Sequence, residues 1–173
     1  MIDKTVLLVI AGEGFQFVEY SDTKKEIEAA GLTVVTASNV AQSAKGHNDV
    51  TVPVDLVLEE VDTKKYDGVF LIGGPGALKH LDIQEIHRIL NEMMIAQKPF
   101  GAICIAPRIL AKAHVIVGKR ATGWNNDNEL ETIFSQNNVT YIPEPVVVDG
   151  NVVTADGPSS AEAFGKEIVK ILQ

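Results

Sequence analysis

The chain has 173 residues, of which 46% are hydrophobic and 22% are charged, and its formal net charge is -8 at pH 7. This size and composition predict one globular domain over residues 1–173, with a core that needs no disulfide or structural metal. The acidic balance argues against a nucleic-acid partner, because binding to phosphate backbones relies on clustered Lys and Arg. A single cysteine excludes an internal disulfide and multi-thiolate metal sites, and it fits a reducing, cytoplasmic location.

The chain also lacks signals for membranes or export. No apolar run approaches the length of a membrane span, and the first apolar run leads to Glu13 instead of a small-residue cleavage site. We therefore expect no membrane partner and read the N-terminal run as a strand.

Continuous aliphatic runs, typical of strands buried on both faces, alternate along the chain with segments of helical periodicity. Residues 46–49 favour a turn, and the segment from there to residue 61 stays unassigned. In chain order we expect a strand at 5–10, a helix at 18–30, strands at 32–37 and 69–74, a helix at 83–96, a strand at 100–103, a helix to 113, a hairpin of 145–149 with 152–154, and a helix at 159–172 that Ser159 or Ser160 caps.

Alternating strands and helices predict an α/β fold with a mainly parallel sheet that is covered on both faces. Three of the strands end in turns that carry Gly12 and Gly14, Gly73 and Gly74, and Cys104. Because the carboxyl ends of parallel strands line the crevice of such a sheet, we expect these three turns to converge there.

Cys104 lies where an apolar run ends and a helical pattern begins. A sharp turn between a strand and a helix lifts one side chain above the carboxyl edge of the sheet, as in a nucleophile elbow. Most lone cysteines are inert core residues, but this position favours a reactive thiol.

Four motifs in the same order resemble the ThiJ/PfpI superfamily, which includes protein deglycases, PfpI-type intracellular proteases and Hsp31-like glyoxalases. They are FQFVE at 15–19, LIGGPGA at 71–77, AICIAP at 102–107 and VVVDGNVVTADGP at 146–158. The resemblance spans essentially the whole chain. It implies a flavodoxin-like three-layer sandwich with a mainly parallel sheet, similar to class I glutamine amidotransferases.

The resemblance also implies a set of site residues. Cys104 would be the reactive residue, Glu19 would touch it, and the backbone amides of Gly74 and Ile105 would form an oxyanion site. An ionised carboxylate beside a thiol disfavours the thiolate, whereas a protonated carboxyl group donates a hydrogen bond to sulfur and favours it. Glu19 must therefore hold a proton if Cys104 is to react as a thiolate, and the two groups would titrate together.

The sequence departs from the family pattern at four positions. Ile105 replaces the His that follows the nucleophile in PfpI-type proteases, and Leu78 replaces their acidic partner. The stretch around Tyr141 lacks the His of the deglycase branch, and Asp156 replaces an Arg of the terminal loop. Peptidase activity is therefore disfavoured.

Other candidate sites are weak. The four histidines share no metal-ligand spacing, so we expect no metal; they are His47, His80, His87 and His114. His47 lies in a segment that could fold over the crevice, and Trp124 could line the pocket or serve only in packing. The segment at residues 12–17 imitates a dinucleotide-binding turn but lacks its third glycine, so we expect no such cofactor.

The leading prediction is a cofactor-free, cysteine-dependent enzyme of the glyoxalase or deglycase kind, acting on small carbonyl compounds such as methylglyoxal. The first alternative is a non-catalytic redox sensor or chaperone that works through oxidation of Cys104. The second is an intracellular cysteine peptidase or amidase of the PfpI type. The resemblance also implies a homodimer or a larger homo-oligomer.

Overall fold

A seven-stranded sheet forms the middle layer of the protein, in a computed structural model that describes residues 3–173. Every neighbouring pair is parallel except β11 with β12, which form an antiparallel hairpin at one edge. The strand order is β11 (Val146–Asp149), β12 (Val152–Ala155), β8 (Phe100–Ile103), β7 (Gly68–Leu71), β1 (Thr5–Ile10), β3 (Thr33–Ser38) and β6 (Leu56–Val57).

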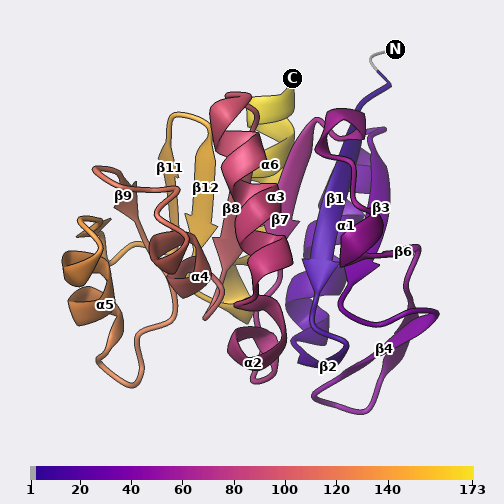
Figure 1. Cartoon of the computed structure of the whole chain (residues 1–173), viewed down its shortest axis with the longest axis horizontal. Coiled ribbons are helices and arrows are strands. Elements are labelled where there is room, and N and C mark those ends of the chain that lie inside the picture. The colour runs from indigo at the N-terminus through magenta and orange to yellow at the C-terminus, as the bar shows by residue number, and fades with distance from the viewer. Residues whose placement is uncertain (1–2) are drawn as a thin grey trace.

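Helices cover both faces of this sheet (Figure 1). The first helix, α1 (Phe17–Ala29), packs along the last, α6 (Ala161–Leu172), on one face. On the other face lie α3 (Gln84–Ile95) and the short α4 (Pro107–Lys112). The central strands β7 and β8 are buried along their whole length, because both of their faces meet helices. The flavodoxin-like α/β fold is thereby confirmed.

The long elements lie close to where the sequence predicts them. The strands at residues 5–10 and 100–103 have the predicted bounds, and the hairpin forms as expected. The third strand was predicted too long: it ends at Leu71 because Gly74, with a φ of 118°, turns the chain away. Ser160 stands at the N-cap of the last helix, as predicted, but its hydroxyl group caps no backbone N–H and donates to Asp156 Oδ1 at 2.5 Å instead.

Several short elements were not predicted. A second sheet joins β2 (Glu13–Phe15), β4 (Ser43–Gly46) and β5 (Thr51–Pro53), and a two-stranded sheet joins β9 (Arg120–Ala121) with β10 (Thr140–Tyr141). The additional helices are α2 (Ala77–Leu81), α5 (Leu130–Gln136) and single 3-10 turns at Leu58–Glu60, Thr63–Lys65 and Pro158–Ser160.

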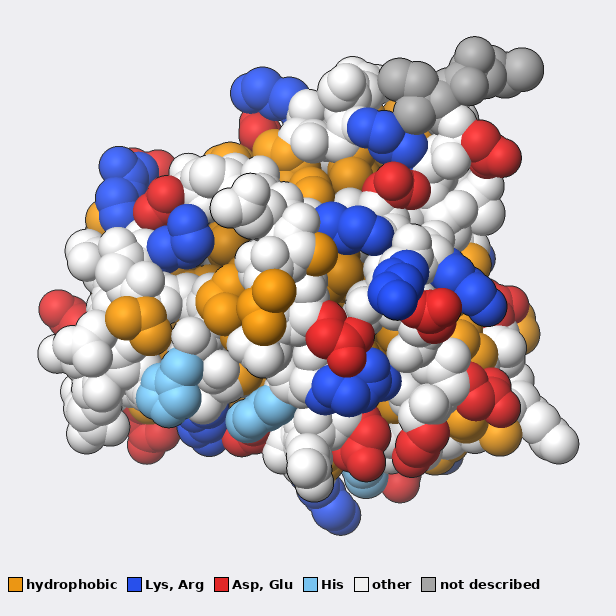
Figure 2. All heavy atoms as spheres, turned by 45° about the horizontal axis from the view of Figure 1, so that its top comes forward, with side chains coloured by type: hydrophobic (Ala, Val, Ile, Leu, Met, Phe, Trp, Pro, Cys, Tyr) orange, Lys and Arg blue, Asp and Glu red, His pale blue; other side chains and the backbone are white. Residues whose placement is uncertain are grey.

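The surface carries charges of both signs. On the face in Figure 2, acidic and basic side chains are interspersed among small groups of hydrophobic ones. Such mixing on this face gives no extended basic area of the kind that binds a phosphate backbone. Over residues 3–173, none of the helices has the length and apolar character needed to cross a bilayer.

Candidate active site

Cys104 occupies a strained turn between β8 and α4. Its φ of 64° lies in the left-handed region, which residues other than glycine rarely adopt. Two backbone hydrogen bonds hold it there: Cys104 N donates to Ala155 O at 2.9 Å, and Trp124 N donates to Cys104 O at 2.7 Å. The strain is therefore held by the neighbouring strand and loop, as expected for a nucleophile elbow.

Glu19 reaches the thiol from the first turn of α1. That helix begins where the Gln16 side chain accepts a hydrogen bond from Val18 N at 3.0 Å. The Glu19 side chain is fully buried, and its Oε2 accepts a hydrogen bond from Gly73 N at 2.9 Å. Its carboxyl group also interacts with the side chain of Cys104. The structure therefore brings together the two side chains that the sequence paired.

The three glycine and cysteine turns converge as predicted. Gln16 N donates to Gly73 O at 2.9 Å, and Gly76 N donates to Gly14 O at 3.0 Å, so the turns after β1 and β7 are bonded to each other. Gly73 has no room for a side chain, because a Cβ there would lie 2.6 Å from the Cβ of Cys104. Close approach of backbone to the thiol therefore requires glycine at this position.

Burial dominates the electrostatics of Glu19. Loss of solvent raises the pKa of Glu19 to about 7, although the hydrogen bonds from Cys104 and from Gly73 N oppose that change. Near neutral pH this carboxyl group therefore exists in both protonation states.

Burial also raises the pKa of the Cys104 thiol, and the negative charge of an ionised Glu19 raises it further. The backbone N–H groups of Ile105 and Gly74 act in the opposite direction, because N–H dipoles near the sulfur favour its negative form. On balance the pKa of the thiol is raised, and an ionised Glu19 disfavours the thiolate more than a protonated one does.

The free oxygen of Glu19 indicates where that proton lies. Oε2 already accepts the N–H of Gly73, whereas Oε1 is buried without a conventional hydrogen-bond partner among residues 3–173. A proton on Oε1 would make it a donor toward the sulfur of Cys104. That Glu19 is protonated when Cys104 is a thiolate stays a prediction.

Cys104 faces a pocket of about 390 Å³ whose lining is mainly apolar. Trp124 forms part of this lining, as the sequence allowed, and no histidine lines it. A small, weakly polar molecule fits such a pocket best. The lining residues are Gln16, Gly74, Pro75, Cys104, Ile105, Trp124 and Pro158.

The other residues singled out from the sequence lie elsewhere. Tyr141 and Asp156 line a second, polar pocket of about 250 Å³, which also contacts Trp124. His47 does not fold over the thiol, since its backbone N donates to Phe15 O at 3.0 Å and it does not line the pocket. Leu78 is half-buried in α2.

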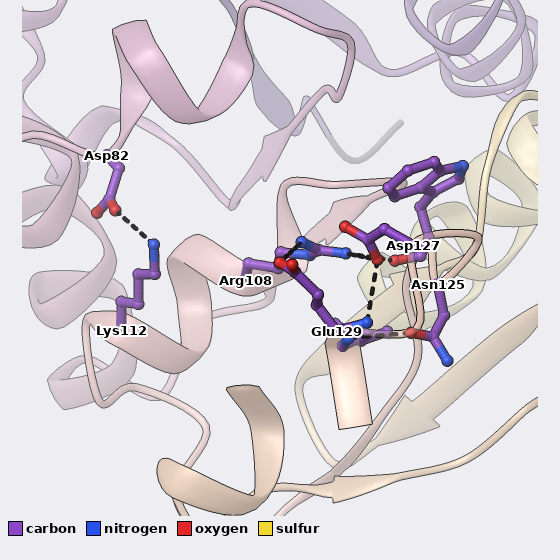
Figure 3. Close-up of polar contacts among 8 residues, drawn as sticks. Asp82, Arg108, Lys112, Asn125, Asp127 and Glu129 are labelled. Carbon is purple, nitrogen blue, oxygen red and sulfur yellow. Dashed lines mark hydrogen bonds and ion pairs between the residues drawn. The ribbon is translucent and has the colours of Figure 1, made fainter. Parts of the chain in front are cut away.

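Sequence reasoning missed Arg108, which lies in α4 four residues after the cysteine. Its side chain is only 3% exposed and forms an ion pair with Asp127 at 2.7 Å (Figure 3). The available signal was a charged residue within the apolar run from Pro107 to Ala111, all of which is buried. Charged side chains are rarely buried unless they are paired.

Comparison with known proteins identifies the family. The sequence model of the DJ-1/PfpI family matches residues 4–171. The chain belongs to the DJ-1/PfpI family. Its structure superposes on the ThiJ/PfpI domain protein of Brachyspira murdochii with a TM-score of 0.92 at 30% identity, covering 98% of this chain and 96% of that one. The resemblance drawn from the four sequence motifs is thereby confirmed.

Two curated DJ-1/PfpI relatives carry names that describe an activity. A deglycase of Thermococcus kodakarensis is 30% identical over 96% of this chain and 99% of its own length. A glutathione-independent glyoxalase of Caenorhabditis elegans is 28% identical over 98% of this chain and 89% of its own length. Within residues 3–173, no three His, Cys, Asp or Glu side chains gather to hold a metal ion.

Proposed function

We propose that this DJ-1/PfpI protein is a cysteine-dependent enzyme that converts small reactive carbonyl compounds, of the methylglyoxal type, without a cofactor. One observation carries the proposal: Cys104 opens into a mainly apolar pocket while its sulfur contacts a buried carboxyl group and two backbone N–H donors. The names of the deglycase and glyoxalase relatives support the same substrate class.

The first step is addition to the aldehyde. With the shared proton on Glu19, the Cys104 thiolate attacks the aldehyde carbon, a C–S bond forms, and the carbonyl π electrons move to oxygen. The N–H groups of Gly74 and Ile105 stabilise this oxyanion as charge leaves the sulfur. Glu19 then donates its proton to the oxygen, which gives a neutral hemithioacetal.

The second step moves a proton between carbons. The Glu19 carboxylate removes the proton of the former aldehyde carbon, and the electrons of that C–H bond form an enediolate with the adjacent carbonyl. Glu19 then returns the proton to the neighbouring carbon, while the hydroxyl proton of the first carbon passes to the neighbouring oxygen and a carbonyl forms at the first carbon. The product is a thioester, and water hydrolyses it to a 2-hydroxy acid and the free thiol. The sum consumes one water molecule, and the oxidation of one carbon balances the reduction of the other.

Peptide hydrolysis fits this site less well. Protonation of an amine leaving group requires a general acid on the side of that group, where PfpI-type proteases carry a histidine. Ile105 and Leu78 stand at the two partner positions and hold no proton to transfer. Glu19, held by Gly73 N, is the one buried acid at the thiol.

The deciding experiment measures lactate formed from methylglyoxal. Wild type should turn over, and Cys104→Ser should fall to the background rate because an alcohol is far less nucleophilic than the thiolate. Circular dichroism of the variant checks that the fold is intact. Equal rates for wild type and Cys104→Ser, or no turnover by wild type, would contradict the proposal.

A second candidate function is redox sensing, and the lack of a histidine in the pocket favours it. Each peroxide would oxidise the sulfur by two electrons and leave as water, so that two steps give a sulfinate. The donors around the sulfur suit such an anion. A stable gain of two oxygens by wild type, with no turnover of methylglyoxal, would favour this function over the first.

A cytoplasmic location and assembly into a homodimer or larger homo-oligomer stay predictions. The first rests on the single cysteine and the second on the family resemblance.

A further inference from the structure

Arg108 is a buried cation with few partners. Its Nη2 donates to Asp127 Oδ1 at 2.7 Å and to Trp124 O at 3.2 Å, as Figure 3 shows for the pair with Asp127. Glu129 lies 3.8 Å away but is largely exposed, and Arg108 Nε has no partner within residues 3–173. Burial of a charged group costs desolvation energy, and incomplete pairing does not fully offset that cost. A gain in stability therefore does not explain why Arg108 is buried.

The contacts of Arg108 with Trp124 indicate a different role for this side chain. Its guanidinium group lies 5.6 Å from the centroid of the Trp124 ring, within the range of a cation–π contact. The peptide N–H of Trp124 is bonded to Cys104 O, and its carbonyl is bonded to Arg108. Ring, N–H and carbonyl of Trp124 are therefore all tied to the segment that carries the thiol.

Trp124 also lines two cavities. It lines both the pocket of about 390 Å³ at Cys104 and the polar pocket of about 250 Å³ that contains Tyr141 and Asp156. A displacement of Trp124 would therefore change the shape of both cavities.

We propose that Arg108 is a positioning residue that, together with Asp127, fixes Trp124 as the wall between these pockets, so that Trp124 sets the size of the compounds that reach Cys104. The carbonyl nature of those compounds rests on the proposed function. The size limit itself does not, because it applies to any reagent that attacks the thiol.

The test replaces Asp127 and leaves Arg108 in place. Asp127 is more exposed than Arg108, so its loss threatens folding less. Trp124 is the only tryptophan and Cys104 the only cysteine, so fluorescence and alkylation each report on a single residue. In Asp127→Ala the emission should shift to longer wavelength. The ratio of alkylation rates for pyrene maleimide over iodoacetamide should rise roughly fivefold, the scale of one lost polar contact.

The matched control is Asp82→Ala, which breaks a different ion pair of α4, between Lys112 and Asp82 at 3.3 Å (Figure 3), together with the 2.7 Å contact of Asp82 with His87. This variant should leave the emission and the rate ratio unchanged. Asp127→Asn, which keeps an acceptor oxygen for Arg108, should restore most of the wild-type ratio.

An unchanged ratio in Asp127→Ala, or an equal change for both reagents, would overturn the proposal, because either result means that Trp124 does not select by size. Both readouts are independent of turnover. Wild type that fails to convert methylglyoxal would therefore refute the proposed function and leave this result intact.

Discussion

Glu19 is fully buried, and a single backbone N–H, that of Gly73, is its donor from the main chain. Burial of an ionised carboxylate is costly, so folding favours the protonated form of this side chain. The same protonated form is the one that favours a Cys104 thiolate. Glu19 therefore lowers the stability of the protein at the pH values where it is ionised.

The cost of burying an ionised Glu19 predicts how the stability of the protein depends on pH. The pKa of Glu19 is raised from 4.5 to about 7, so between these values the folded state holds a proton that the unfolded state has released. Stability from this group is present below pH 4.5 and is lost as the pH rises toward 7, at roughly 1.4 kcal/mol per pH unit, or about 3 kcal/mol in all. Glu19→Gln should accordingly stabilise the protein by up to about 3 kcal/mol at pH 8 and much less at pH 5.

Urea unfolding at the two pH values measures the difference. Glu131→Gln is the matched control, because Glu131 stands in the first turn of α5 but is exposed. The control should change stability equally at both pH values. A Glu19→Gln variant that is destabilised to the same extent at pH 5 and pH 8 would contradict the prediction.

For individual residues, the sequence predicts the pairing of Cys104 with Glu19 but not the residues that surround the two. Cys104 and Glu19 lie in local motifs, and the need for a proton on Glu19 follows from charge alone. The partnership of Arg108 with Asp127 and Trp124 joins segments about 16 to 19 residues apart, whose contact depends on how a loop folds back. No local pattern encodes such a contact.

Among the elements, the turn after β7 leaves no room for a side chain at Gly73. A Cβ on Gly73 would lie 2.6 Å from Cys104 Cβ, 2.8 Å from Ile103 O and 2.9 Å from Glu19 Oε2. All three neighbours are held by backbone or buried packing, so none can move without disturbing the site. The close approach of Cys104 and Glu19 therefore depends on the lack of a side chain at Gly73.

Gly73→Ala should therefore separate Cys104 from Glu19. We expect a loss of stability of about 1–3 kcal/mol, as for other overpacked sites, and slower alkylation of Cys104 at neutral pH. Gly157→Ala is the control, since its Cβ would meet no atom within 4 Å and its φ of 166° is extended backbone. Wild-type alkylation by Gly73→Ala would show that the close contact does not set the reactivity.

The elements that the sequence predicted share one property. The strands β1, β7 and β8 are continuous apolar runs, and α3 and α6 carry one apolar stripe each, so periodicity reveals them. The missed strands, such as β2 and β4, have only three or four residues. The two pair with each other although they lie far apart in the sequence. A strand of three or four residues is also too short to show a periodic pattern.

For the whole molecule, the site depends on the parallel order of the central strands. The neighbours β1, β7 and β8 all end at the same edge, which brings their three following turns together. The antiparallel hairpin of β11 and β12 then supplies Ala155 O, which anchors the cysteine turn. Chain segments from both halves of the sequence therefore build one site.

This arrangement predicts that the chain unfolds as one unit. The buried side chains form a single core cluster that includes residues of α5, such as Phe134, next to the loop of Trp124. Trp124 N is bonded to Cys104 O, so the loop cannot leave without exposing the cysteine turn. In urea, Trp124 fluorescence and far-ultraviolet circular dichroism should give coincident transitions, as in a two-state process. A fluorescence change at lower urea than the loss of helix would mean that the loop opens by itself, and the pocket wall would then be a separate, weaker unit.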